Sequence, residues 1–264
     1  MLRNSTPYRV RQKKGEEKRI VLILTFFVIG LLGVSLTVYG MYRVLCKTAL
    51  FMVTETDIVG ADRITQKEIL ALCDLKLQTN LLTVSPARLQ KRVEAHPWIA
   101  WAEIKRQWPN RLLVRIKERQ PVAIANVEGK LFFVDAKGIV FTEVNPDADL
   151  DFPVISGLGR SDLDIQNPSG ALQCALQFLR YVPKNDSVLP RQNISEINIR
   201  QGGDLVVFLA DRPFPIYLGS EAMERKHYRL VKVLGWLYKK KEFEITEYIR
   251  LDYGSDKVLV GKTS

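Results

Sequence analysis

One stretch constrains the fold more than any other: residues 20–42 read IVLILTFFVIGLLGVSLTVYGMY and contain no charged side chain. At a rise of ~1.5 Å per residue, a helix of this length covers the ~30 Å hydrocarbon core of a bilayer. A cleaved signal peptide has a shorter apolar core of roughly 7–15 residues, followed by small residues. The bulky Arg43, Val44 and Leu45 also argue against lipoprotein processing at Cys46. The stretch therefore predicts an uncleaved membrane anchor.

The distribution of positive charge predicts how this anchor is oriented. Residues 1–19 contain seven Lys or Arg and two Glu, a net charge of +5 out of +10 for the whole chain. The twenty residues after the anchor contain only Arg43 and Lys47. Since cations favour the cytoplasmic side, the N-terminus is expected inside and residues 43–264 outside, in the periplasm or its equivalent. The basic tail then contacts anionic lipid, and a nucleic-acid partner is not expected.

The outer part begins with a module expected over residues 49–119, in the order strand, helix, helix, strand, strand. Residues 50–59 are rich in apolar and β-branched types and predict the first strand. Thr65 and Glu68 have the spacing of a capping box and predict the start of a short helix. Ser85, followed by proline, predicts the start of a second helix.

The segment KRQWPNRLLVRIKERQPVA, residues 105–123, predicts a β-hairpin. A two-residue loop would place Trp108 opposite Arg111 and would mix apolar and charged residues on both faces. A three-residue loop over 109–111 places Trp108 opposite Leu112 and gives one clean apolar face. That face is expected to contain Ile104, Trp108, Leu112, Val114 and Ile116.

The opposite face of this hairpin is cationic. It presents Lys105, Arg115 and Lys117. Such residues form either a solvated sheet face or a docking surface for another protein of the envelope. The sequence does not choose between these two interpretations.

A second module is expected over residues 120–262. It contains short alternating strands, among them two around the turn at residues 135–138, and two amphipathic helices. The first helix covers residues 169–182, and the second is expected to be capped by Ser220 and to run through Lys240. The fold class is therefore α+β: one N-terminal transmembrane helix, a β-α-α-β-β module, and a mostly antiparallel β domain with two helices.

Residues suited to catalysis are sparse. The chain has two histidines, His96 and His227, each in a pattern typical of packing, and it has no S-x-x-K or H-E-x-x-H motif. Its three cysteines, Cys46, Cys73 and Cys174, are far apart and are expected to be small hydrophobic residues rather than a disulfide framework or zinc site. No catalytic residue, cofactor, metal or small-molecule substrate is expected.

Taken in order, several motifs resemble the FtsQ/DivIB family of bacterial cell-division proteins over nearly the whole chain. They follow the basic tail (1–19) and the anchor. The motifs are VG at 59–60 with IT at 64–65 and EI at 68–69, NLLTV at 80–84, HPWI at 96–99, the hairpin at 105–123, FVDAKGIVF at 133–141 and FPVISG at 152–157. The resemblance implies that the first module is a POTRA domain and the second is the β domain of this family.

The resemblance also implies partners. In this family the late strands offer a sheet edge to a small single-pass protein of the FtsB or DivIC type, which pairs with FtsL. Transferred to this sequence, the partner-binding residues are Tyr253, Ser255, Asp256 and Leu259. The family ending resembles Asp-Leu-Arg-Tyr, whereas residues 250–253 read Arg-Leu-Asp-Tyr, so the two charges are exchanged.

The expected function is a non-enzymatic scaffold at the division septum. It would link early and late division proteins, contact other membrane proteins of the divisome, and help control septal peptidoglycan synthesis. One alternative is a POTRA protein that acts as a chaperone or assembly factor in the envelope. A peptidoglycan-acting enzyme is the other alternative, and the shortage of reactive motifs argues against it.

Overall fold

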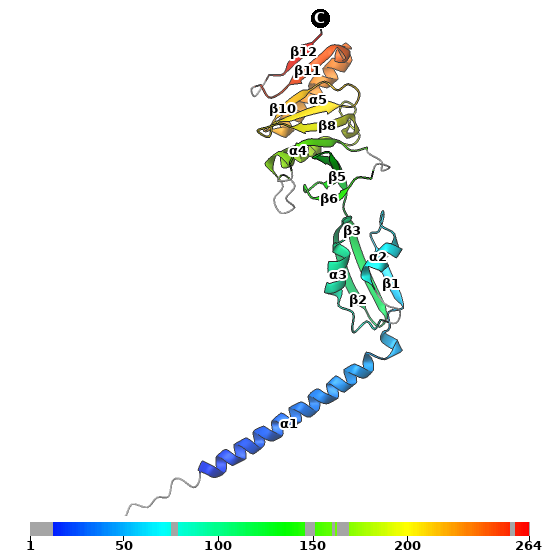
Figure 1. The fold of residues 1–264 in the computed structure, drawn as a ribbon, viewed down its shortest axis with the longest axis vertical. Helices are drawn as coiled ribbons and strands as arrows, with labels where there is room; N and C mark the ends of the chain where they lie inside the picture. Colours follow the sequence, from blue (N-terminus) through cyan, green and yellow to red (C-terminus); the bar gives the residue numbers. More distant parts are fainter. Residues whose placement is uncertain are drawn as a thin grey trace, which may run out of the picture. The chain divides into compact units, whose positions relative to one another are not determined.

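The structure is a computed structural model that describes residues 13–74, 79–145, 151–159, 162, 169–253 and 257–263, with side chains from residue 18 onward. The chain folds as two compact units (Figure 1). The first unit comprises residues 1–94 and 101–116. The second comprises residues 95–100 and 117–264.

Helix α1 (Lys13–Leu45) contains the predicted anchor. Its segment Lys18–Leu45 is 28 residues long and strongly apolar, and its apolar stretch is not buried by the rest of the protein. Within the part of the chain that the structure describes, α1 alone is long and apolar enough to cross a membrane. An unburied apolar helix of this length is the form expected of a single-pass anchor.

The elements after α1, which lie mainly in the first unit, have the predicted order of strand, helix, helix, strand, strand. The elements are β1 (Glu55–Val59), α2 (Gln66–Cys73), α3 (Pro86–Glu94), β2 (Ile99–Gln107) and β3 (Arg111–Glu118). The strands form a sheet in the order β1-β3-β2, with β1 parallel to β3. The predicted capping box is confirmed, since the Thr65 hydroxyl accepts the Glu68 N–H and the Glu68 carboxylate accepts the Thr65 N–H.

The first strand is shorter than predicted. Residues Ala49–Phe51 form a 3₁₀ turn, and regular pairing begins only at Glu55. Backbone groups before Glu55 bond to loops instead: Val53 N–H donates to Thr79 O at 3.0 Å, and Thr54 N–H donates to Asn110 O at 3.1 Å. The apolar composition of residues 50–59 therefore predicted a strand but did not reveal where its pairing begins.

The hairpin confirms an odd-length loop but corrects the position of Trp108. Strand β2 ends at Gln107 and β3 begins at Arg111, so three residues form the turn. Trp108 is the first of these three residues and therefore leaves the alternation of the strand. It is 56% exposed instead of buried, and its ring packs edge-on against Phe51 at 5.8 Å. The other four residues predicted for the apolar face are buried.

Two of the three predicted outer-face cations, Lys105 and Arg115, are paired within the sheet, and Lys117 is exposed. Lys105 and Arg115 both contact the Glu103 carboxylate, Arg115 at 3.3 Å. Arg111 contacts Glu55 on β1 at 3.0 Å. These hydrogen bonds and opposite charges lower the pKa of Glu103. The paired charges favour the interpretation as a solvated sheet face.

The second unit is built on one sheet of nine strands, in the order β12-β11-β10-β9-β8-β7-β4-β5-β6. Five of its eight neighbouring pairs are antiparallel, and the pairs β4–β7, β7–β8 and β10–β11 are parallel. The strands are β4 (Pro121–Val127), β5 (Lys130–Asp135), β6 (Val140–Glu143), β7 (Val154–Leu158), β8 (Ile194–Ile199), β9 (Leu205–Leu209), β10 (Ile216–Gly219), β11 (Thr246–Arg250) and β12 (Leu259–Lys262).

Helices α4 (Gly170–Tyr181) and α5 (Met223–Lys240) contribute to one core together with this sheet (Figure 1). The buried side chains of α5 are Met223, Leu230, Leu234 and Leu237, and those of α4 include Leu172, Ala175, Leu176, Phe178 and Leu179. Helix α4 is capped by Ser169, as the predicted helix over 169–182 requires.

Helix α5 begins later than predicted. Its N-cap is Ala222, with a left-handed φ of 54°, and the first helical residue is Met223. Ser220 lies before this turn, where its carbonyl accepts a hydrogen bond from the Cys174 thiol at 2.9 Å. The serine was therefore the wrong choice of cap, because the chain needs two further residues to turn from β10 into the helix.

A partly buried arginine caps the end of α4. The Arg191 guanidinium donates from Nη2 to Leu179 O at 2.8 Å and to Val182 O at 2.9 Å, and from Nε to Val182 O at 3.2 Å. These carbonyls belong to the last turn of the helix and lack helical partners. Burial lowers the pKa of Arg191, but these three bonds hold the cation in place.

Replacing Arg191 by alanine is expected to destabilise the second unit by about 3 kcal/mol, because two carbonyls lose charge-assisted hydrogen bonds. The measurement is urea denaturation of the full chain in detergent micelles, followed by tryptophan fluorescence. Arg180→Ala is the matched control, because Arg180 is exposed in the last turn of the same helix. A loss no larger for Arg191→Ala than for Arg180→Ala would contradict the capping role.

Candidate docking edge at the C-terminal strand

Strand β12 lies at one end of the nine-stranded sheet. It pairs antiparallel with β11 on one side, with Arg250 opposite Leu259 and Ile249 opposite Val260. Among the strands that the structure describes, none pairs with its other side (Figure 1). An edge of this kind presents backbone N–H and C=O groups that a further strand can satisfy.

The hydrogen bonds of β11 show which residue of β12 points its backbone outward. Ile249 N–H donates to Pro215 O at 3.1 Å and Leu251 N–H donates to Tyr217 O at 2.8 Å, both toward β10. Because alternate residues of a strand point their backbone groups to opposite sides, Arg250 faces β12 and bonds with Leu259. Val260, the next residue, therefore directs its N–H and C=O away from the sheet.

The side chains of β12 divide between the core and the solvent. Val260 packs against the core of the second unit. Leu259 is 50% exposed on the other face. Gly261 lies against the ring of Tyr248, so closely that a Cβ at this position would lie inside the ring's van der Waals surface. The edge thus combines outward-facing backbone groups with one exposed aliphatic side chain.

Two of the four predicted partner-binding residues lie in this region of the structure. Tyr253 is 69% exposed and follows β11, and Leu259 is the first residue of β12. Ser255 and Asp256 lie outside the described residues. The structure therefore brings Tyr253 and Leu259 to the same sheet edge, at the two ends of the connection between β11 and β12.

The exchanged charges before this connection pair with each other. Arg250 donates to the Asp252 carboxylate from Nε at 3.1 Å and from Nη2 at 2.8 Å. These hydrogen bonds lower the pKa of Asp252 and raise that of Arg250. The guanidinium also lies over the rings of Tyr217, at 4.8 Å, and Tyr253, at 5.7 Å. The guanidinium of the pair thus contacts the exposed Tyr253 ring, and the two opposite charges of the pair satisfy each other.

A further feature, missed by sequence reasoning, is a set of exposed apolar side chains late in the second unit. The exposed large hydrophobic residues of the second unit, among those the structure describes, all lie between α5 and β12; they are Tyr228, Trp236, Tyr238, Ile245, Tyr253 and Leu259. Lys262 at the end of β12 lies over the Trp236 ring at 5.0 Å. The signal was present in the sequence, because Tyr228 and Trp236 lie off the apolar stripe of α5.

The histidines and thiols of the described residues show no arrangement suited to catalysis. His227 packs near Phe178, with ring centroids 6.2 Å apart, and burial lowers the pKa of His227. Cys73 is buried, which raises the pKa of its thiol. In the described ranges, no group of three or more His, Cys, Asp and Glu side chains could hold a metal ion. What this region offers is a binding edge.

Comparison with known proteins gives consistent matches. The description "POTRA domain, FtsQ-type" matches residues 51–119, and "Cell division protein FtsQ/DivIB, C-terminal" matches residues 123–251. The chain is 31% identical over 226 residues to "Cell division protein FtsQ" of Geotalea daltonii, covering 85% of this chain and 80% of that protein. It is 29% identical over 233 residues to the protein of the same name from Geobacter sp. (strain M21), covering 87% and 83%.

One solved structure is also similar. It is the major extracytoplasmic domain of the trans isomer of the cell-division protein DivIB from Geobacillus stearothermophilus. The identity is 18% and the TM-score is 0.31, and the match covers 45% of this chain and 94% of that one. A TM-score this low adds nothing to the sequence matches.

Proposed function

Because the chain belongs to the FtsQ/DivIB family of bacterial cell-division proteins, we propose that it is a membrane-anchored scaffold whose β12 edge accepts a strand from a partner division protein. The observation that supports this most strongly is the position of β12 at the end of the sheet, with Val260 directing its backbone outward. Strand addition would satisfy that N–H and C=O and bury Leu259 and Tyr253. No reaction is involved, so the protein acts as a scaffold and not as an enzyme.

We propose partners of the FtsB or DivIC type, together with FtsL and other membrane proteins of the divisome. In this proposal Tyr253, Ser255, Asp256 and Leu259 contact the added strand. The Arg250–Asp252 pair is already satisfied internally. Recognition at this end therefore depends on backbone bonds and apolar side chains more than on charge. Through these contacts the protein would link early and late division proteins and restrain septal peptidoglycan synthesis until assembly is complete.

We propose that the chain is divided into a tail, a membrane anchor and two outer domains. Residues 1–19 form a cytoplasmic basic tail that contacts anionic lipid, and residues 20–42 cross the inner membrane. Residues 49–119 form the POTRA domain, and residues 120–262 form the β domain that carries the docking edge. Both outer domains would lie outside the cytoplasm, since cations are concentrated before the anchor. The division septum is proposed as their location because the chain belongs to a family of division proteins.

Hydrogen exchange of the full chain in nanodiscs tests the proposed edge directly. The probe is the outer segment of the FtsB- or DivIC-type protein from the same bacterium. Exchange of the Val260 amide is expected to slow at least tenfold on binding, because this N–H gains a hydrogen bond. The amides of Leu259 and Gly261 already face β11, so they serve as internal controls and should change less. Protection restricted to α5 would contradict strand addition.

A further inference from the structure

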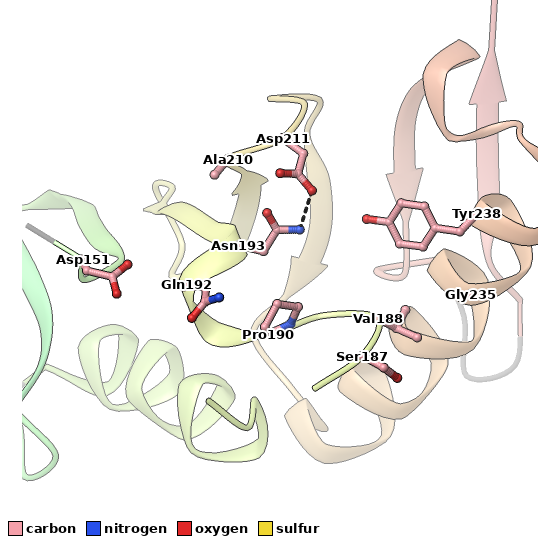
Figure 2. Close-up of a pocket in the computed structure, with 10 residues that line it drawn as sticks. All are labelled: Asp151, Ser187, Val188, Pro190, Gln192, Asn193, Ala210, Asp211, Gly235 and Tyr238. Carbon is pink, nitrogen blue, oxygen red and sulfur yellow. Dashed lines mark hydrogen bonds between the residues drawn. The ribbon is translucent and has the colours of Figure 1, made fainter. Parts of the chain in front are cut away.

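A large cleft lies in the second unit, and no residue of strand β12 lines it. Its volume is about 880 Å³, and Figure 2 shows it between the segment 187–193, the turn at Ala210 and Asp211, and helix α5. A smaller hollow of about 450 Å³ shares Asp211 and Tyr238 with it. The larger cleft has the size of a ligand site, for which ~300–1,000 Å³ is usual.

The lining of this cleft is unusually polar for a ligand site. Six of its ten lining residues have polar side chains: Asp151, Ser187, Gln192, Asn193, Asp211 and Tyr238. Ligand pockets in general are lined mainly by apolar side chains with only a few polar groups. A cleft lined in this way suits a ligand that itself has many hydrogen-bonding groups.

The polar groups are held in fixed positions. Asn193 Nδ2 donates to Asp211 Oδ2 at 2.9 Å, which orients both side chains and leaves the amide oxygen of Asn193 as an acceptor. Tyr238 points its hydroxyl into the cleft from α5 (Figure 2). The Tyr238 ring packs on Phe243, with centroids 4.6 Å apart. Tyr238 is only partly desolvated, which raises the pKa of its phenol, and the neutral phenol can donate a hydrogen bond.

Gly235 keeps the wall of the cleft open. It lies in the interior of α5, where glycine is a poor helix former compared with alanine. A Cβ at this position would meet Val188 at 3.8 Å, an ordinary contact, so packing within the protein does not require glycine. The missing side chain instead adds free space to the cleft.

Charge narrows the class of ligand. The lining residues that the structure describes include two aspartates and no lysine or arginine, which disfavours phosphates and carboxylates. Lys241 lines the adjoining hollow, and Lys239 and Lys240 end α5, so the surroundings do not favour a strongly cationic ligand either. A neutral ligand rich in hydroxyl and amide groups fits both facts.

We propose that this cleft binds a neutral oligosaccharide, with Asn193, Asp211 and Tyr238 bonding its hydroxyl and amide groups. Carboxylate, carboxamide and phenol side chains together provide acceptors and donors for such groups. The proposal goes beyond the docking function, and it depends on that function only for the location outside the cytoplasm, where cell-wall glycans are accessible. The sugar site and the β12 edge share no residue.

The test is titration calorimetry of the full chain in nanodiscs with a tetramer of N-acetylglucosamine as the probe. Saturable binding is expected. Tyr238→Phe should weaken it by about threefold to tenfold, the effect of one lost hydrogen bond. Gly235→Gln should abolish it by filling the cleft while keeping a good helix former in α5. The matched control is Tyr228→Phe, which removes a hydroxyl from an exposed position of the same helix outside the cleft.

Three outcomes would overturn the proposal: absence of binding, equal effects of Tyr238→Phe and Tyr228→Phe, and tighter binding of a lysine-rich peptide than of the sugar. Each variant is checked for its thermal midpoint and for Val260 protection by the partner segment. A variant that loses sugar binding but keeps Val260 protection shows that the cleft and the β12 edge bind their ligands independently. If the parent chain binds the sugar but the partner segment does not protect its Val260 amide, the docking function is contradicted and the sugar site is not.

Discussion

Replacing Val260 by proline is expected to weaken partner binding at the β12 edge by at least tenfold while leaving the protein folded. Proline has no N–H, and the N–H of Val260 points away from the sheet. The bonds of Leu259 to Arg250 stay in place, and proline is tolerated in edge strands where the N–H side faces solvent. We expect affinity for the partner segment to fall by at least tenfold, measured by calorimetry on the full chain in nanodiscs.

The control for this variant is Val260→Ala. Alanine also removes the packing of the valine side chain against the core, but it keeps the outward N–H. A loss of affinity with proline and not with alanine identifies a backbone hydrogen bond as the cause. If both variants bind the partner like the parent chain, the partner does not add a strand to β12.

Gly157→Ala is expected to have the largest effect on stability, a loss of about 3 kcal/mol or more. Gly157 lies in β7, near the middle of the nine-stranded sheet, with a φ of +80°. A Cβ there would overlap the carbonyl oxygen of Ile199 and lie 3.0 Å from its carbonyl carbon. Both atoms belong to the backbone of the neighbouring strand β8, so neither can move without disturbing the pairing of β7 with β8.

Gly129→Ala is the control that separates the cost of the left-handed backbone conformation from the cost of atomic overlap. Gly129 has nearly the same φ, +84°, but a Cβ there would meet no atom within 4 Å. Only the left-handed conformation then costs free energy, about 1 kcal/mol. Urea denaturation of both variants, followed by Trp236 fluorescence with the other tryptophans replaced by phenylalanine, measures the difference. Equal losses would show that β7 and β8 can move apart to accept the side chain.

The sequence was most informative where a pattern depends on neighbouring residues. Thr65 and Glu68 predicted a helix start because a capping box is a local arrangement, and the apolar stripe predicted α5 for the same reason. Ser220 was a wrong cap because the path from β10 into the helix depends on packing around Ala222. Trp108 was wrongly assigned to a buried face because the turn begins one residue earlier than predicted. That shift takes Trp108 out of the strand and so out of its alternation of faces.

The docking edge illustrates a second limit. The residues around 259 do not by themselves reveal whether a strand there lies between others or at the end of a sheet. That depends on the order of all nine strands, which is a property of pairings distant in sequence. The outward direction of Val260 required, in addition, the hydrogen bonds of Ile249 and Leu251 to β10. Resemblance to a family supplied Tyr253 and Leu259 as candidates, and the structure supplied the backbone geometry.

The ring of Tyr248 against Gly261 has a consequence for genetic screens of this protein. Gly261 lies on the very strand proposed to meet the partner, so variants there would be recovered among mutants defective in assembly. Any side chain at this position collides first with Tyr248 of the same molecule. The assembly defect of such mutants would arise from displacement of the β11–β12 pair and not from a lost contact with the partner. A suppressor that shortens residue 248, such as Tyr248→Ala paired with Gly261→Ala, should restore assembly and distinguish the two causes.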